Sequence, residues 1–174
     1  MNLFTGEASE AWFGGEVPAS VKPLLLQAAT AAGDERSALL WTAQTLAPRS
    51  LGVYYALYKH HATRREFELA ERAARRGLDE AALQAGLAGD WRTVQPGGGT
   101  DFHADGPARF WLFTLKALAF IHLRSGRPDA AAEFLDRIDI LEPEARLGND
   151  VIGRLLEAVR PAGGAPLSPR PPAA

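Results

Sequence analysis

Apolar residues recur along most of the chain at steps of three and four, which is the spacing of an amphipathic α-helix. No stretch alternates with the two-residue period of a β-strand over a useful length. Glycine, proline or a polar cluster ends each helical stretch. We therefore expect an all-α protein with helices over 21–32, 34–47, 51–63, 65–84, 108–126, 128–141 and 149–159.

The helical spacing fails over 86–107, a segment that contains three consecutive glycines and two prolines. A loop of more than 20 residues in a short helical chain is unusual and often functional. We expect a glycine-rich loop insertion there, within a helical domain spanning 18–159. Residues 1–17 form a separate N-terminal segment, and the proline- and glycine-rich tail over 160–174 is expected to be disordered.

One stretch, "GRPDAAAEFLDRIDILEP" (126–143), has a regular internal spacing. Ala131 follows Gly126 by five residues, Leu135 follows by four more, and Pro143 lies eight further on. The same small residue recurs at Ala38 and Ala70. The first two of these three alanines are about one repeat apart, and the last two are separated by one repeat plus the loop insertion. The spacing thus predicts an internal repeat of helical hairpins.

This spacing resembles a tetratricopeptide (TPR) unit, a 34-residue hairpin with small residues at the helix crossing and a terminal proline. Leu115 and His122 depart from the aromatic residues common at their positions, and Tyr58 stands where a small residue is usual. The resemblance implies three TPR-like hairpins plus a C-terminal capping helix. An irregular helical bundle stays open as the alternative, because alanine-rich helices match such spacings by chance.

Three phrases carry a narrower resemblance: "LGVYYALYKHHATRREFELAERAARRGLDEAA", "GDWR" and "GPARFWLFTLKALAFIHLRSG". Together they look like a group of small proteobacterial TPR-like proteins encoded among nitrogen-fixation genes, that of nitrogenase-associated factor T. The resemblance implies a non-enzymatic accessory protein that binds a nitrogenase component during its assembly, inactivation or protection. It offers no catalytic residues to transfer to this chain.

The composition of the chain excludes several classes of partner and site. The chain has 174 residues, 47% of them hydrophobic and 23% charged, with a formal net charge of -2 and no cysteine. The charge gives no case for nucleic acid, and no apolar run is long enough for a bilayer. The lack of cysteine excludes disulfides and thiolate metal sites and fits a reducing compartment. We expect a cytoplasmic protein with no membrane partner and no cofactor.

Two groups of residues are candidates for metal chemistry. His60 and His61 are adjacent, and neighbouring helical residues point about 100° apart, so we expect no shared metal ion between them. Asp101, His103 and Asp105 in the loop could bind a divalent ion or exchange protons. A small metal-binding protein or metal-dependent enzyme built on this loop is the less favoured alternative. No nucleophile or phosphate-loop motif is present, so we expect no enzyme.

A protein-binding groove formed by the first helices of the hairpins is the favoured site. Aromatic residues and arginines dominate protein interfaces, although most of the aromatic residues here also suit a core. An adaptor for another partner protein is one alternative, and a homo-oligomer built on Trp12 and Phe13 is another. The predicted partner-binding residues are Tyr54, Tyr58, His61, Trp91, Arg92 and Trp111.

Overall fold

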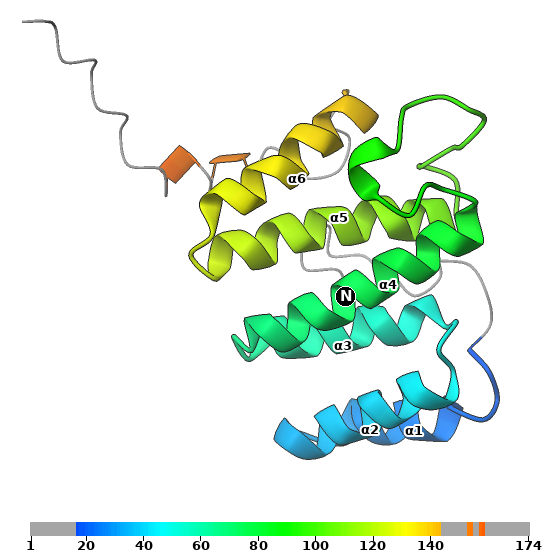
Figure 1. Ribbon diagram of the computed structural model, residues 1–174. Coiled ribbons are helices and arrows are strands. Elements are labelled where there is room, and N and C mark those ends of the chain that lie inside the picture. Colours follow the sequence, from blue (N-terminus) through cyan, green and yellow to red (C-terminus); the bar gives the residue numbers. More distant parts are fainter. Residues whose placement is uncertain (1–16, 144–152, 155–156, 159–174) are drawn as a thin grey trace, which may run out of the picture.

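The helices of the protein follow one another in space as they do along the chain (Figure 1). The computed structural model describes residues 17–143, 153–154 and 157–158. Between 17 and 143 it contains no strand, and its helices are α1 (Lys22–Thr30), α2 (Gly33–Leu46), α3 (Leu51–Thr63), α4 (Phe67–Ala85), the 3-10 helix η2 (Trp91–Thr93), α5 (Pro107–Arg124) and α6 (Pro128–Leu141). The all-α prediction is confirmed for this part of the chain.

The expected boundaries of these helices lie within a few residues of the observed ones. The expected helix over 149–159 falls largely outside the described residues, although 153–154 and 157–158 are helical. The tail over 160–174 and all but one residue of the N-terminal segment over 1–17 also lie outside them.

Short connections join most of the helices and fold the chain back on itself. Only residues 31–32, 47–50, 64–66 and 125–127 separate consecutive helices on either side of the long connection between α4 and α5. Each helix therefore packs mainly on the helices before and after it, and α3 also contacts α5 (Figure 1). The result is a layered stack in which every second helix runs in the same direction.

The turns within the three helix pairs share one backbone feature. Gly33, Arg65 and Gly126 have φ angles of 55°, 62° and 77°, in the left-handed region that glycine adopts most easily. The steps between these three turn residues equal the steps between the three alanines of the repeat. Arg65 is the only non-glycine residue with positive φ among the described residues. The turn geometry thus recurs with the sequence spacing.

The second and third of these turns also share their hydrogen bonds. The N–H of Glu66 donates to the carbonyl of His61, and the N–H of Arg127 donates to the carbonyl of His122, both at 2.9 Å. This six-to-one bond is the helix-ending arrangement that a left-handed residue permits. The turns of α3–α4 and α5–α6 therefore share one backbone geometry, offset along the chain by the step from Arg65 to Gly126.

Close packing joins α3, α4 and α5. A methyl group added at Gly77 on α4 would lie 2.8 Å from Cβ of Tyr54 and 3.3 Å from a ring carbon of Phe110. Real Cβ atoms essentially never approach so closely, so the absence of a side chain lets α4 lie against both neighbours. Ala70 and Ala131, the small residues of the repeat, are fully buried.

The connection between α4 and α5 is anchored to the helices. It contains η2, and the side chains of Trp91, Val94 and Phe102 are buried. Asp90 caps η2 by accepting a hydrogen bond from the N–H of Arg92. The buried guanidinium of Arg137 on α6 donates to the carbonyl of Val94. This long connection therefore packs on α5 and α6 by apolar and polar contacts.

The first helix pair departs from the other two. Ala38, which matches the buried Ala70 and Ala131 in the sequence repeat, is exposed. α1 packs on α2 but makes hardly any contact with α3, whereas α3 does contact α5. The space between α1 and α3 therefore stays open.

Candidate binding groove

A groove of about 1020 Å³ lies between α1 and α3 and is bounded by α2 and by the connection before α3. Its volume is at the upper end of the range for small-molecule sites. The apolar part of its wall comes mainly from leucines and alanines of the three helices. These residues include Val17, Leu25, Leu26, Ala28, Ala29, Leu40, Ala47, Leu51, Tyr55 and Ala56.

The polar part of the wall is cationic. Five of the lining side chains are basic: Lys22, Arg36, Arg49, Lys59 and Arg64. No carboxylate lines the groove among the described residues. Two of the cations are paired at the rim, since Arg49 lies 3.4 Å from Glu80 and Arg64 lies 2.9 Å from Asp34. A lining with five basic side chains favours an anionic ligand.

Two buried nitrogen atoms on residues that line the groove have no hydrogen-bond partner. They are Nε of Arg36, in the first turns of α2, and Nε2 of His60, near the end of α3. Buried polar atoms are nearly always hydrogen-bonded in folded proteins. Burial lowers the pKa of His60, and the neighbouring His61 and Arg36 lower it further. Each of the two nitrogen atoms could donate a hydrogen bond to an acceptor bound in the groove.

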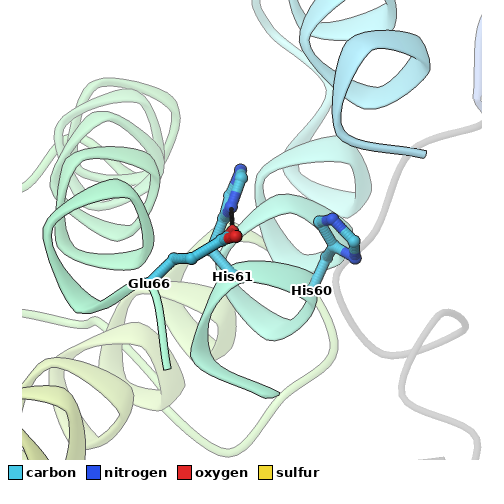
Figure 2. A group of neighbouring side chains, drawn as sticks. All are labelled: His60, His61 and Glu66. Atoms are coloured by element: carbon cyan, nitrogen blue, oxygen red, sulfur yellow. Dashed lines mark hydrogen bonds and ion pairs between the residues drawn. The ribbon is translucent and has the colours of Figure 1, made fainter. Parts of the chain in front are cut away.

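His60, His61 and Glu66 form a cluster at the end of α3, with ligand atoms that lie within 4.8 Å of one another (Figure 2). The cluster has the residue types of a metal site, which sequence reasoning did not expect from adjacent histidines. Nε1 of Trp41 donates to Nε2 of His61 at 3.1 Å, so the His61 proton is on Nδ1, which donates to Glu66 at 2.7 Å. Both ring nitrogens of His61 are therefore already bonded.

Glu66 is also engaged on its second oxygen. Nε of Arg64 donates to Oε1 of Glu66 at 2.7 Å, and Nη2 of Arg64 donates to Asp34 on α2 at 2.9 Å. The hydrogen bonds from His61 and Arg64 lower the pKa of Glu66. A metal ion would have to replace most of these bonds. The cluster is better explained as a tether that holds α2 to the turn between α3 and α4.

Most of the predicted partner-binding residues lie in the core. Relative exposure is 7% or less for Tyr54, Tyr58, His61, Trp91 and Trp111. Tyr54, for example, uses its hydroxyl to donate to the carbonyl of Pro48 and packs against Gly77. Side chains buried in this way cannot contact a partner directly in this conformation.

Arg92 is the exposed member of the predicted set, and it lies away from the groove. Its guanidinium stacks over the ring of Trp91 at 4.4 Å and pairs with Glu133 on α6 at 2.9 Å. Trp91 in turn stacks on Phe134 with ring centroids 4.4 Å apart. This stack fastens η2 to α6.

The loop residues Asp101, His103 and Asp105 are bonded to their own surroundings. Asp101 accepts hydrogen bonds from the N–H groups of His103 and Ala104, which lower its pKa. Asp105 accepts from Arg109 at 2.8 Å, and the His103 ring lies 3.7 Å from Glu142. These bonds account for the three side chains as parts of a structured turn.

The residues that line the groove were not among those predicted from the sequence. The signal was present in "LLL" at 24–26. Three consecutive leucines span about 200° of a helix, which is more than one buried face requires. Leu26 is 72% exposed in the structure and lines the groove.

The chain matches no protein-family model, no curated protein and no solved structure. In the described part of the chain, no helix combines the length and the apolar character that crossing a bilayer requires.

Proposed function

We propose that this chain is a non-enzymatic protein-binding module of TPR-like hairpins, and that the groove between α1 and α3 holds a segment of a partner protein. The observation that carries the proposal is the groove itself, which combines an apolar wall with a cationic rim. An extended or helical peptide buries apolar side chains in such a groove and places its acidic residues at the edge.

The recurrent hairpin geometry supports the TPR-like part of the proposal. Left-handed turn residues recur at the steps of the sequence repeat, and the small residues at Ala70 and Ala131 are buried at helix crossings. His61 and His122 lie in the last turns of α3 and α5, and each contacts the second helix of the preceding pair. His61 bonds Trp41 on α2, and His122 lies 3.3 Å from Glu71 on α4. Repeat proteins are stabilised by such neighbour-to-neighbour contacts.

The chemistry of the groove favours binding over catalysis. Its only imidazole, that of His60, shares the wall with cations, and no carboxylate of the described residues lines the groove to orient it. A general base in an active site usually has such an orienting group. The lining also offers no thiol, since the chain has no cysteine.

A nitrogenase component is the first partner to test, because the chain resembles the nitrogenase-associated factor T group. In this proposal the protein is an accessory factor that binds the component during its assembly, inactivation or protection. Recovery of a different partner through the same groove would make the chain a general TPR-like adaptor.

The experiment is affinity purification of the tagged chain and two variants from cells that are fixing nitrogen. Leu26→Asp places a charge on the wall of the groove. Leu83→Asp is its matched control, because Leu83 is equally exposed at 72% but does not line the groove. We expect a nitrogenase component to be recovered with the native chain and with Leu83→Asp, and to be lost with Leu26→Asp. Equal recovery with all three chains would refute the groove as the binding site.

A further inference from the structure

The first residues that the structure describes lie at the groove. Val17, the first described residue, is itself part of the lining, and Lys22 and Leu25 follow it along the same wall. The segment 1–16 that precedes Val17 is therefore joined directly to one end of the groove. Its local concentration at this site is high, because so short a connection keeps it close.

This N-terminal segment complements the groove in charge. It contains three glutamates, Glu7, Glu10 and Glu16, and no lysine or arginine. The groove contains five basic side chains and no carboxylate among its described lining residues. Opposite charges of this kind fix the register of a bound segment.

The same segment complements the groove in shape and polarity. Leu3, Phe4, Trp12 and Phe13 are large apolar side chains, and aromatic residues are the usual anchors of a bound segment. Leu26 presents a largely exposed apolar surface to the groove. An aromatic side chain placed there would remove that surface from water.

The length of the segment also fits. α1 and α3 run in the same direction and have 9 and 13 residues, so these two walls of the groove are about 14 Å and about 20 Å long. An extended chain covers about 3.4 Å per residue, so the stretch from Val17 back to Glu10 spans about 24 Å. An extended segment of this length, starting from Val17 near the end where Lys22 begins α1, is long enough for Glu10 to reach the other end, where Arg36 and His60 lie.

We infer that residues 1–16 dock in the groove between α1 and α3 and that a partner protein must displace them. Trp12 and Phe13 contact the apolar wall, and the Glu10 carboxylate accepts hydrogen bonds from Nε of Arg36 and the ring of His60. The two buried nitrogens that have no partner in the described structure are then satisfied. This inference rests on the proposed function, because it takes the groove to be a site for peptide segments.

The docking can be tested without any partner. The chain has no cysteine, so Ser9→Cys provides a single site for a nitroxide spin label. The label broadens the NMR signals of methyl groups that lie near it. We expect broadening at Ala28, Ala29 and Leu40 around the groove, and none at Leu135 and Ile138 in the last helix pair.

Charge variants of the labelled chain supply the controls. Replacing Glu7, Glu10 and Glu16 together by glutamine should abolish the broadening at the groove, and Arg36→Gln should reduce it strongly. Arg72→Gln is the matched control, because Arg72 is an exposed cation on α4 outside the groove. Broadening that is absent from the native sequence, or unchanged in the triple glutamine variant, would overturn the inference.

Measurements of partner binding distinguish a failure of this inference from a failure of the proposed function. If residues 1–16 are docked in about ten of every eleven molecules, the apparent affinity for the partner is about tenfold lower than that of the open groove. The triple glutamine variant should then bind the partner about tenfold more tightly. If no docking is seen but Leu26→Asp still abolishes partner recovery, the inference fails and the proposed function stands. If docking is seen but Leu26→Asp leaves partner recovery intact, the groove serves only the chain's own segment, and the proposed function fails.

Discussion

The helix pairs α3–α4 and α5–α6 differ from the pair α1–α2 in how completely they bury their surfaces. In α3–α4 and α5–α6, the side chains of Tyr54, Leu118 and Trp111 are buried, and α3, α4 and α5 pack closely enough to require a glycine at Gly77. In the α1–α2 pair, Leu26 is exposed, and α1 stands apart from α3. The helix pairs thus form a closed core in one region and an open groove in the other.

This difference bears on where a binding site is to be sought in the chain. A residue of a repeat that packs on both neighbours has no surface to offer a ligand. A helix pair that packs imperfectly leaves apolar and cationic side chains along an open groove, as at Leu26 and Arg36. The irregular pair is therefore the better place to look for a binding site than the regular ones.

The largest expected difference between the two regions concerns ion pairs. The pair between Lys116 on α5 and Glu142, directly after α6, is buried, with side-chain exposures of 5% and 1%, whereas Asp34 of the Arg64–Asp34 pair is 97% exposed. Removing one charge from a buried pair costs about 3–5 kcal/mol, and an exposed pair contributes about 0–1 kcal/mol. Urea unfolding of Glu142→Gln and Asp34→Asn should show these values, and equal losses would contradict the comparison.

Truncation of a leucine in each region gives the next largest difference. Leu118 on α5 is fully buried, so Leu118→Ala should lower the free energy of unfolding by about 2–5 kcal/mol. Leu26 is 72% exposed, so Leu26→Ala should change it by no more than about 0.5 kcal/mol. A loss above about 2 kcal/mol in Leu26→Ala would show that the groove is closed in solution. Thermal and urea denaturation measure both values.

Substitution of two helical glycines by alanine should give a smaller difference in stability between the two regions. A methyl group at Gly77 would meet Tyr54 at 2.8 Å, so Gly77→Ala should cost about 1–3 kcal/mol. A methyl group at Gly52, in the first turn of α3 beside the groove, would meet nothing within 4 Å. Gly52→Ala should therefore stabilise the protein by about 0.5–1 kcal/mol, because alanine favours the helix. Changes of the same sign in both variants would contradict this account.

The smallest expected effect is a dependence of stability on pH. Burial lowers the pKa of His60 beside the groove and of His122 on α5. The unfolded chain then binds more protons than the folded one once the pH falls below about 6.5, so the free energy of unfolding decreases on acidification. Urea unfolding at several pH values should show a shallower decrease for His60→Gln and for His122→Gln than for the native chain. An unchanged pH dependence would mean that neither imidazole is held neutral.

The fold was predictable from sequence where local pattern decides it. The three- and four-residue spacing located six helices, and the alanines at 38, 70 and 131 gave the repeat steps that the turns at Gly33, Arg65 and Gly126 also follow. The positive φ of Arg65 was not predictable, because arginine has no preference for that conformation.

The site was predictable only in part, because burial depends on how helices pack. Aromatic residues such as Tyr58 and Trp111 suit an interface and a core equally well, and the structure places both in the core. Arg36 and Lys59 lie far apart in the sequence and come together only when α2 and α3 pack. The triple leucine at 24–26 was the one local sign of the groove.

The central claim is that the partner binds between α1 and α3. Hydrogen–deuterium exchange of the chain, alone and in complex with the partner recovered by affinity purification, tests this claim most directly. The account predicts slower exchange on binding in peptides covering 22–30 and 51–63, with little change over 128–141. Protection centred on α6 and on the connection between α4 and α5, with none on α1 or α3, would contradict it.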